Sequence, residues 1–416
     1  MNASQPTVSF KTVGCRLNQA ETEKMADQFS RAGYRLVQTD EPCDIAVINT
    51  CTITHSAERD CARLARRLRR KGARIVILAG CAVEYNGTEL QQRTGADIIV
   101  GQNLKFKLPQ ILAKDFGINP QTNPLPVELK ANRTRALIKA QDGCAFRCSY
   151  CVVPDTRGLP TSLPLQTVLD DIRQHADQGC REIVITGANL GCYNDNGNNL
   201  IKLLSEAEKI SGIERIRIGS IESTTAERQV IDYMADSAKL CHFLHLPLQS
   251  GDDTILKKMR RHYTAAQYRS LIEYAIERVP DLGLGTDIIV GFPGETAAAF
   301  QNSFNLINEL PFSNLHVFSY SIRSGTPAAD MPHQIDAAVK KERSARLIEL
   351  GHKKRADFAR SFIGRQVSLL IERITPDSAA GWTQQYLPAR ISNPTAKEND
   401  IITFTPTTTK NDTLLG

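Results

Sequence analysis

Three segments in the N-terminal third of the chain share one layout, which restricts the fold more than any other feature of the sequence. Each is a short, apolar, β-branched run that ends in a cysteine, at Cys15, Cys51 and Cys81. Helical stretches, residues 18–32 and 55–70, separate these runs. The alternation predicts an α/β unit with a doubly wound parallel sheet. Because the carboxyl ends of parallel strands line one crevice, we expect the three cysteines to converge there.

Three convergent thiolates favour an iron–sulfur site with only three protein ligands. The alternative is that these cysteines are small buried hydrophobic residues, as free cysteines often are. Cys43 and Cys61 do not share the layout, and packing explains them better. A strand at residues 98–100 closes this unit, and the proline-rich residues 108–126 are predicted to be a linker. The predicted first domain therefore covers residues 1–126.

A second set of cysteines, Cys144, Cys148 and Cys151, has the spacing C-x3-C-x2-C on one short loop. Such a loop can hold three irons of a cubane iron–sulfur cluster and leaves the fourth iron without a protein ligand. A zinc knuckle or three unrelated buried thiols is the alternative. Zinc would require a fourth ligand nearby, and the next histidine is His175, well outside the loop.

Residues 130–362 alternate between strands and helices and form the predicted second domain. The candidate strands are residues 136–140, 182–186, 215–219, 243–246, 285–290 and 314–319. Six strand–helix units predict an open, partial (βα)6 barrel, whose chemistry would lie at the carboxyl ends of the strands. The loop with Cys144, Cys148 and Cys151 follows the first of these strands and is therefore expected on the catalytic rim.

Other strand ends of this domain carry polar residues or glycines that would face the same cavity. The candidate cofactor-binding residues are Tyr150, Thr186, Gly187, Glu222, Gln249, Asp287 and Gly291. Glycine permits close backbone approach to a ligand, and Tyr150 could stack on an adenine. A turn or a helix cap explains any one of the polar residues equally well, and packing of the loop explains Tyr150.

The last part of the chain, residues 363–416, contains four or five short β-rich runs separated by Pro, Asn, Asp and Gly. This pattern predicts a small all-β barrel. Its acidic and basic residues balance, so charge does not indicate RNA binding. Trp382 and Tyr386 offer stacking surfaces for bases, although burial in the small core suits Trp382 better.

Composition narrows the class of protein. Of 416 residues 41% are hydrophobic and 23% charged, as in a folded soluble protein, and no apolar run could span a bilayer. The first residues lack a signal-peptide layout, so we expect a cytoplasmic protein, in which eleven cysteines indicate metal or redox chemistry. The predicted helix at residues 55–70 is strongly basic. Its Arg63, Arg66, Arg67 and Arg70 form either a solvated face or a contact with nucleic-acid phosphates.

The cysteine loop resembles the signature of the radical S-adenosylmethionine (SAM) enzymes, in which SAM chelates the open iron. Along nearly its whole length, the chain resembles the methylthiotransferases within that group. The resemblance rests on Gly14-Cys15-Arg-Leu-Asn18, Asn49-Thr-Cys51-Thr-Ile-Thr54, Ala79-Gly-Cys81, Leu246 to Gly251, Asp287 to Glu295 and Gly381-Trp-Thr-Gln-Gln-Tyr386. The tail is similar to the terminal TRAM barrel of that family, and Thr186-Gly-Ala-Asn-Leu-Gly-Cys-Tyr193 looks most like its MtaB branch.

This resemblance implies two [4Fe-4S] clusters, with Cys144, Cys148 and Cys151 for radical generation and Cys15, Cys51 and Cys81 for sulfur delivery. It implies two SAM molecules per turnover, a tRNA substrate, and an electron donor and a sulfur source of unknown identity. The substrate of the MtaB branch is the N6-threonylcarbamoyladenosine beside the anticodon. Related branches act on isopentenyl-adenosine in tRNA or on an aspartate of a ribosomal protein. Outside the family, a non-catalytic iron–sulfur or zinc RNA-binding protein is the alternative. The sequence leaves the oligomeric state open.

Overall fold

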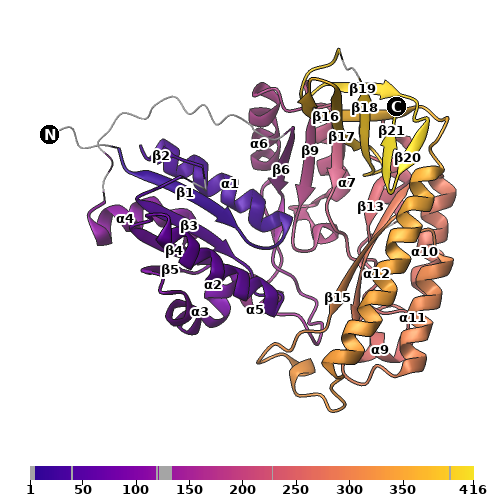
Figure 1. Cartoon of the computed structure of the whole chain (residues 1–416), viewed down its shortest axis with the longest axis horizontal. Coiled ribbons are helices and arrows are strands. Elements are labelled where there is room, and N and C mark those ends of the chain that lie inside the picture. The colour runs from indigo at the N-terminus through magenta and orange to yellow at the C-terminus, as the bar shows by residue number, and fades with distance from the viewer. Residues whose placement is uncertain (1–4, 39–40, 119, 121–133, 227, 393–394) are drawn as a thin grey trace. The chain divides into compact units, whose positions relative to one another are not determined.

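The structure is a computed structural model that describes residues 5–38, 41–118, 120, 134–226, 228–392 and 395–416 (Figure 1). It divides into two units. The first contains residues 1–132, 143–145 and 151–159, and the second contains residues 133–142, 146–150 and 160–416. The boundary expected between residues 126 and 130 lies outside the described residues. Two short pieces of the cysteine loop therefore belong to the N-terminal unit, although they follow a strand of the other unit in the sequence.

A five-stranded parallel sheet forms the centre of the first unit. Its strands are β1 (Thr7–Thr12), β2 (Arg35–Leu36), β3 (Ile45–Thr50), β4 (Ile75–Gly80) and β5 (Ile98–Val100). They pair in the order β2-β1-β3-β4-β5, and every pair of neighbours is parallel. The strand order reverses between β1 and β3, which is the kind of position where doubly wound sheets bind ligands. The predicted α/β unit is confirmed.

Two separate apolar cores cover the two faces of this sheet. Alternate residues of each strand point to opposite faces. Val47 and Ile77 pack with α1 (Arg16–Arg31) and α4 (Leu108–Phe116), whereas Ile48 and Leu78 pack with α2 (His55–Arg70) and α3 (Cys81–Thr94). Each fully buried aliphatic side chain of this kind stabilises the fold by about 1.5–3 kcal/mol. Helices thus cover both faces of the sheet, and its strand ends are the part left for a binding site.

The predicted linker at residues 108–126 is wrong in its first half, because Leu108–Phe116 forms the helix α4. Leu108 and Leu112, four residues apart, are both buried in the core of the unit. Pro109 lies in the first turn, where a helix tolerates proline because its missing N–H would be unpaired there in any case. Residues 119 and 121–126 lie outside the described part of the chain.

Six parallel strands form the barrel wall of the second unit. They are β6 (Arg135–Lys139), β9 (Glu182–Thr186), β12 (Arg215–Ile218), β13 (Phe243–His245), β14 (Gly283–Val290) and β15 (Asn314–Ser319). Two three-stranded sheets, β12-β9-β6 and β13-β14-β15, are joined by a parallel bridge between Ile216 and Leu240. The predicted open, partial barrel is confirmed.

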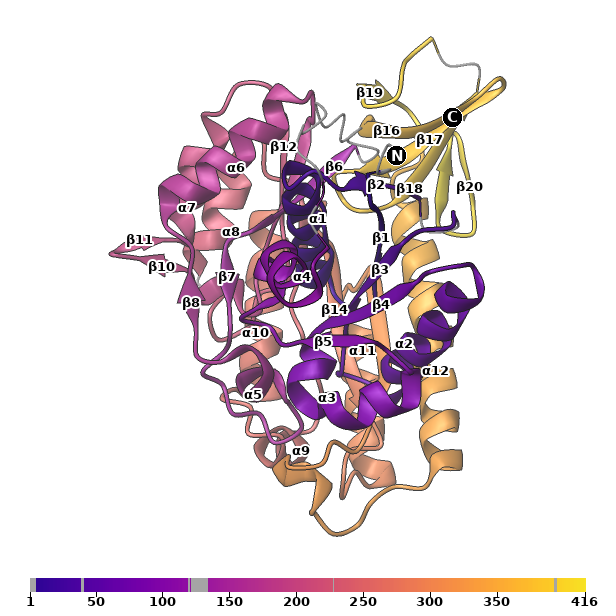
Figure 2. The ribbon, with the colours of Figure 1, turned by 90° about the vertical axis from the view of Figure 1, so that its left-hand side faces the viewer.

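Helices follow the strands of the barrel, as the sequence predicts. They are α6 (Leu165–Asp177), α7 (Leu200–Glu208), α8 (Arg228–Asp236), α10 (Ala265–Arg278), α11 (Ala297–Glu309) and α12 (Ala337–Arg360), with the short α9 (Asp253–Lys258) between α8 and α10. The short α5 (Val153–Arg157) belongs to the first unit. Figure 2 shows α6, α7 and α8 side by side on the outside of the wall. The large shared core lies between helices and strands, so the other face of the strands is left for polar side chains.

The tail of the second unit is a six-stranded sheet, in agreement with the all-β region predicted from the sequence. It contains β16 (Val367–Thr375), β17 (Ser378–Thr383), β18 (Pro388–Ser392), β19 (Ile401–Phe404), β20 (Thr408–Lys410) and β21 (Thr413–Leu415), paired in the order β19-β16-β17-β18-β21-β20. This sheet has its own apolar core, which includes Phe362 at the end of α12.

Two arginines of β12 attach this tail to the barrel. Arg215 donates to the carbonyl oxygen of Trp382 at 3.1 Å, and Arg217 donates to that of Gln384 at 3.0 Å. Both arginines are fully buried and form ion pairs with Glu182 of β9. Because a buried charge costs several kcal/mol without partners, the tail is an integral part of the barrel and not a loosely tethered module.

Among the described residues, no helix is both long and apolar enough to cross a membrane.

Candidate active site

Three neighbouring strand ends carry the cysteines of the N-terminal unit. Cys15 follows β1, Cys51 follows β3, and Cys81 follows β4 as the first residue of α3. Because β1, β3 and β4 are adjacent and parallel, these three residues lie along one edge of the sheet, at the reversal of strand order. Cys51 and Cys81 are buried, while Cys15 is exposed.

Two buried side chains connect these strand ends. The amide of Asn18 donates to the carbonyl oxygen of Val13 at 3.0 Å and to that of Thr50 at 2.9 Å. The Thr50 hydroxyl in turn donates to the carbonyl oxygen of Ala79 at 2.7 Å and accepts from the N–H of Ala82 at 3.2 Å. The backbone within two residues of each of the three cysteines is therefore held by a hydrogen bond to the side chain of Asn18 or Thr50.

Two glycines allow this close approach. Gly14 has a φ of 115°, and a Cβ atom there would lie 2.5 Å from the Cβ of Cys51. Gly80 has a φ of 96°, and a Cβ atom there would lie 2.4 Å from Oδ1 of Asn49. Any other residue would be strained at either position and would also push the strand ends apart.

The electrostatic environment of these thiols suits binding of a positively charged metal. Burial raises the pKa of the Cys51 thiol to about 12, and the neighbouring Cys15 and Cys81 sulfurs raise it further. Burial also raises the pKa of the Cys81 thiol, while Arg157 and Lys105 act to lower it. Thiolates so close together repel one another, and a cationic cluster core would remove that repulsion. The residues present therefore fit a thiolate-ligated metal centre.

A buried polar network lies behind Cys81. The amide of Gln102 donates to Sγ of Cys81 at 3.4 Å, and its oxygen accepts from Nζ of Lys105 at 2.5 Å. Lys105 also pairs with Glu21 at 2.6 Å, and both side chains are only 1% exposed. Burial lowers the pKa of the Lys105 amine, although the Glu21 carboxylate opposes this effect.

The loop with the second set of cysteines is shaped by local contacts. In the N-terminal unit, the N–H of Cys144 donates to the carbonyl oxygen of Gly158 at 3.1 Å, and the N–H of Val153 points to Sγ of Cys151 at 3.4 Å. Gly143 has a φ of 68°, and a Cβ atom there would lie 2.1 Å from the carbonyl oxygen of Leu159. This loop therefore requires glycine immediately before its first cysteine.

Cys148 lies in the barrel unit, beside a buried arginine. A guanidinium N–H of Arg261 lies 3.5 Å from Sγ of Cys148, and Arg261 also pairs with Glu222. The next residue, Ser149, accepts from the N–H of Ala328 at 2.8 Å and donates its own N–H to Met259 at 3.1 Å. Arg261 therefore places a permanent positive charge next to this predicted cluster ligand.

Comparisons with known proteins agree with this geometry. Residues 138–307 match the radical SAM superfamily, and residues 7–101 match the uncharacterized protein family UPF0004. The threonylcarbamoyladenosine tRNA methylthiotransferase MtaB of Bacillus subtilis is 36% identical over 402 residues, which cover 92% of this chain and 89% of the relative. A tRNA-2-methylthio-N(6)-dimethylallyladenosine synthase of Zymomonas mobilis is 35% identical over 381 residues, or 88% and 85% of the two chains.

This chain belongs to the radical SAM methylthiotransferase family. A radical SAM domain takes a [4Fe-4S] cluster and SAM, and both are cofactors of this methylthiotransferase. Among solved structures, the radical SAM methyltransferase TsrM of Kitasatospora setae has the same fold, with a TM-score of 0.58 at 14% identity over 78% of this chain and 77% of that chain.

The residues predicted to bind SAM differ in the contacts that hold them in this methylthiotransferase. Glu222 is held by Arg261 and by the N–H of Ser223, and the backbone of Gln249, with a φ of 64°, pairs with β14 at Asp287 and Ile289. The N–H of Gly291 donates to Glu295 at 2.7 Å. The remaining candidates are Thr186, which is buried, Gly187, which lies against Gln141, and Tyr150, whose ring packs edge-on against Phe292.

Asp287 belongs to a cluster with His245 and His316 that sequence reasoning missed. Its Oδ1 lies 3.0 Å from Nε2 of His245 and 3.1 Å from Nδ1 of His316, and the two rings stack with centroids 5.1 Å apart. Burial would raise the pKa of the Asp287 carboxyl, but the two histidines hold it well below its usual value. Asp287 is therefore a carboxylate at neutral pH.

This cluster has the donor set of a metal site, but its hydrogen bonds argue for another role. Arg355 donates to Oδ1 of Asn314 at 3.0 Å, so Asn314 presents its amide nitrogen to Nε2 of His316 at 3.3 Å. The described contacts of Asp287 and Asn314 thus join both histidine rings in one hydrogen-bonded network on the strands of the barrel.

The arginines predicted to contact RNA lie on the exposed face of α2. Arg63, Arg66, Arg67 and Arg70 are exposed, while Cys61, Ala65 and Leu68 on the opposite face are buried, as the periodicity predicts. Arg63 also lies 3.5 Å from Asp60. The ring of Tyr386 stacks on Trp382 at 4.6 Å and lies 4.9 Å from that of Phe243, so internal contacts already occupy it.

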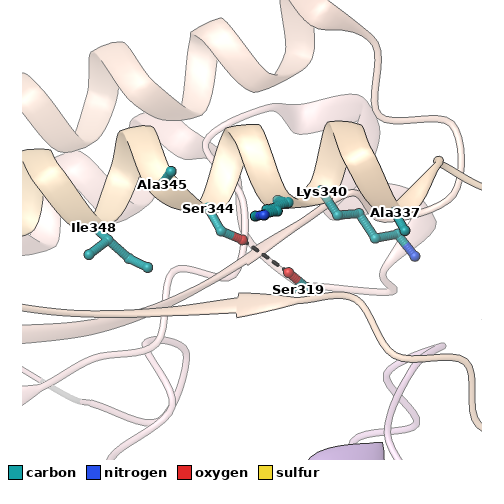
Figure 3. Close-up of a pocket in the computed structure, with 7 residues that line it drawn as sticks. Ser319, Ala337, Lys340, Ser344, Ala345 and Ile348 are labelled. Atoms are coloured by element: carbon teal, nitrogen blue, oxygen red, sulfur yellow. Dashed lines mark hydrogen bonds between the residues drawn. The ribbon is translucent and has the colours of Figure 1, made fainter.

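A shallow cavity of about 450 Å³ lies between β15 and α12 (Figure 3). Its lining combines lysines with small polar and apolar residues: Ser319, Ala337, Lys340, Lys341, Ser344, Ala345 and Ile348. Hydroxyl groups of Ser319 and Ser344 form a hydrogen bond of 3.0 Å across it. Neither the cysteines nor the predicted SAM ligands line this cavity, which is therefore not the candidate active site.

Proposed function

We propose that this enzyme converts N6-threonylcarbamoyladenosine at position 37 of tRNA to its 2-methylthio derivative. The observation that carries the proposal is the line of Cys15, Cys51 and Cys81 along adjacent strand ends, in addition to the radical SAM loop. A radical SAM domain alone needs only the loop. A second thiolate-rich site in the same chain provides the place from which sulfur can be delivered.

The substrate assignment is supported by two relatives of the same name. MtaB of Bacillus subtilis and MtaB of Aquifex aeolicus, 36% and 32% identical to this chain, are both threonylcarbamoyladenosine tRNA methylthiotransferases. Synthases that act on dimethylallyladenosine are 30–35% identical, so they define the main competing substrate. Methylthiolation of a ribosomal protein aspartate is a third possibility, which the same experiment tests.

In this proposal Cys144, Cys148 and Cys151 hold one [4Fe-4S] cluster, and Cys15, Cys51 and Cys81 hold a second. When bound, the first cluster supplies the electron that cleaves SAM, and the resulting radical chemistry activates C2 of the adenine. Arg261 lies beside Cys148 and holds Glu222 in place for contact with SAM. Thr186, Gly187, Gln249, Asp287, Gly291 and Tyr150 complete the proposed SAM-binding residues.

The reaction requires partners that the chain itself does not provide. Two SAM molecules are consumed per turnover, one as the radical source and one as the methyl donor, and a reductant and a sulfur donor must be supplied. A tRNA substrate implies that the enzyme acts in the cytoplasm. Arg63, Arg66, Arg67 and Arg70 on α2 are proposed to contact tRNA phosphates, and Tyr386 is retained as a proposed RNA contact.

Mass spectrometry of tRNA nucleosides tests this function. A strain that lacks the gene should lose 2-methylthio-N6-threonylcarbamoyladenosine and accumulate the precursor, and the wild-type gene should restore the product. A gene that encodes Cys81→Ala should not restore it. If the strain instead loses the methylthio derivative of isopentenyl-adenosine, or if its tRNA is unchanged, the proposed substrate is wrong.

A further inference from the structure

Arg157 occupies a central position in the N-terminal unit. It is the last residue of α5 (Val153–Arg157), and its side chain is only 3% exposed. The guanidinium donates to both carboxylate oxygens of Glu21 at 3.0 Å and to Oδ1 of Asn18 at 2.5 Å. Arginine is suited to this position because its planar fork can donate to a carboxylate and to a second acceptor simultaneously.

Both partners of Arg157 support the strand-end cysteines. Asn18 holds the backbone beside Cys15 and Cys51 through its bonds to Val13 and Thr50. Glu21 reaches Cys81 through Lys105 and Gln102, by contacts of 2.6, 2.5 and 3.4 Å. One guanidinium is therefore connected by unbroken hydrogen bonds to the surroundings of all three of these cysteines.

The backbone around Arg157 supports the other cysteine set. Its helix begins two residues after Cys151, and the N–H of Val153 at its start points to Sγ of that cysteine. Gly158, which follows Arg157, accepts a hydrogen bond from the N–H of Cys144 at 3.1 Å. The segments with Cys144 and Cys151 consequently belong to the same unit as Cys15, Cys51 and Cys81.

We propose that Arg157 is a positioning residue that couples the two metal sites, so that filling one site prepares the other. The proposal rests on the proposed function, because it requires two clusters. Ligation of Cys144 and Cys151 would restrain both ends of the segment that carries Arg157, and Arg157 in turn holds Asn18 and Glu21 beside the strand-end cysteines. The second cluster binds without the cost of ordering these groups again, and this saving is the source of the coupling.

Native mass spectrometry of the full-length protein during anaerobic reconstitution tests the coupling. With iron and sulfide below saturation, independent sites would give a statistical mixture of chains with no cluster, one cluster and two clusters. Coupling of ordinary size makes the second loading step about 5- to 150-fold tighter than the first, so chains with one cluster should be scarce. A statistical mixture in the wild-type protein would overturn the proposal without any variant.

The variant Arg157→Met removes the donors and keeps a side chain of similar length. One-cluster chains should then accumulate, while Arg157→Lys, which keeps a charge and one contact, should give an intermediate distribution. Arg173→Met is the matched control, because Arg173 is 47% exposed and pairs with Asp170, three positions away on the same helix. A distribution in Arg157→Met equal to that of wild type would refute the role of Arg157.

Failure of the proposed function would look different. If wild-type protein never exceeds one cluster at saturating iron and sulfide, the two-cluster function itself is wrong. If it reaches two clusters that load independently, only the coupling is wrong. Should Arg157→Met fail to fold, as circular dichroism would reveal, Glu21→Gln tests the same connection and should also increase the one-cluster species.

Discussion

The two cysteine sets are brought together by different forces. Within the loop, the covalent chain keeps Cys144, Cys148 and Cys151 close, because neighbouring cysteines are at most four residue steps apart and such a segment spans at most about 14 Å. Cys15, Cys51 and Cys81 are far apart in sequence and depend on sheet pairing and on the hydrogen bonds of Asn18 and Thr50. The loop site is therefore a property of a short segment, whereas the strand-end site is a property of a folded unit.

This difference predicts that the two sites respond differently to mutation. Most substitutions outside the loop should spare its ligand set, whereas the strand-end site should be sensitive to any change that shifts β1, β3 or β4 relative to one another. Glycines show the same contrast. Gly143 serves a turn within its own loop, but Gly14 makes room for the side chain of a residue on another strand.

Loss of a single cysteine should separate the sites most clearly. Cys148→Ala should abolish SAM cleavage and methylthiolation, whereas Cys81→Ala should abolish methylthiolation and keep SAM cleavage. Anaerobic assays of 5′-deoxyadenosine and of modified tRNA measure the two activities. Cys43→Ala, which removes a buried cysteine outside both sets, is the control. Retained SAM cleavage in Cys148→Ala would show that the division of roles is wrong.

Asn18→Ala should weaken the strand-end site more than the loop site. It leaves the carbonyl groups of Val13 and Thr50 without a buried donor, at about 1–3 kcal/mol for each unsatisfied group. We expect the iron content after reconstitution to fall towards that of one cluster, with SAM cleavage largely preserved. Gln19→Ala, at the next position of α1, should retain both clusters. Equal iron in the two variants would contradict the role of Asn18.

The cluster of His245, Asp287 and His316 sharpens the comparison, because hydrogen bonds already join its possible metal-ligand atoms. Asp287→Asn should leave the iron and zinc content of the protein unchanged, as measured by mass spectrometry of the metals. It should nevertheless lower the free energy of unfolding by about 1.5–3 kcal/mol, the usual value for a hydrogen bond to a charged group. A loss of bound zinc in this variant would instead identify a metal site.

The same carboxylate predicts a pH dependence. Because its pKa is lower in the folded than in the unfolded protein, its stabilising effect is complete above the ordinary carboxyl pKa of about 4 and is lost as the pH falls below that value. The difference in unfolding free energy between wild type and Asp287→Asn should therefore shrink as the pH falls below about 4. Urea denaturation at several pH values measures it, and a difference that grows below about pH 4 would contradict the assignment.

The smallest effects are expected on α2. Replacing Arg66 or Arg70 by glutamine should weaken tRNA binding modestly. The slope of log K for binding against the logarithm of salt concentration should become shallower by up to about one unit for each lost phosphate contact. SAM cleavage should not change. Binding titrations at several salt concentrations measure the slope, with Arg31→Gln on α1 as an exposed control. Unchanged slopes would favour a purely solvated helix face.

Much of this architecture could be predicted from the sequence, because its signals are local. Apolar runs of the right length gave β9 and β15 at their observed bounds, and helical periodicity gave α2. Leu108 and Leu112 also carried a helical signal, but the surrounding prolines obscured it. The cysteines at strand ends could be recognised because each one repeats the same short layout.

Residues that act through distant partners could not be predicted. The carbonyl oxygens that Asn18 holds are 5 and 32 positions away, and Arg157 lies 139 positions from Asn18. His316 meets Asp287 only because β14 and β15 pair with these two residues opposite each other. Such contacts depend on sheet register and burial. Neither can be predicted from the spacing of residues in a single sequence.

The attachment of the tail to the barrel has a consequence for the order of synthesis. The Trp382 carbonyl that Arg215 binds lies 167 residues further along the chain. At translation rates of about 5–20 residues per second, Arg215 and Arg217 leave the peptidyl transferase centre roughly 10–30 s before their partners exist. During that interval Glu182 is the only one of these partners already made. The two arginines of the nascent barrel therefore lack their carbonyl partners until roughly the last fifty residues are made, and a chain released before then would lack them permanently.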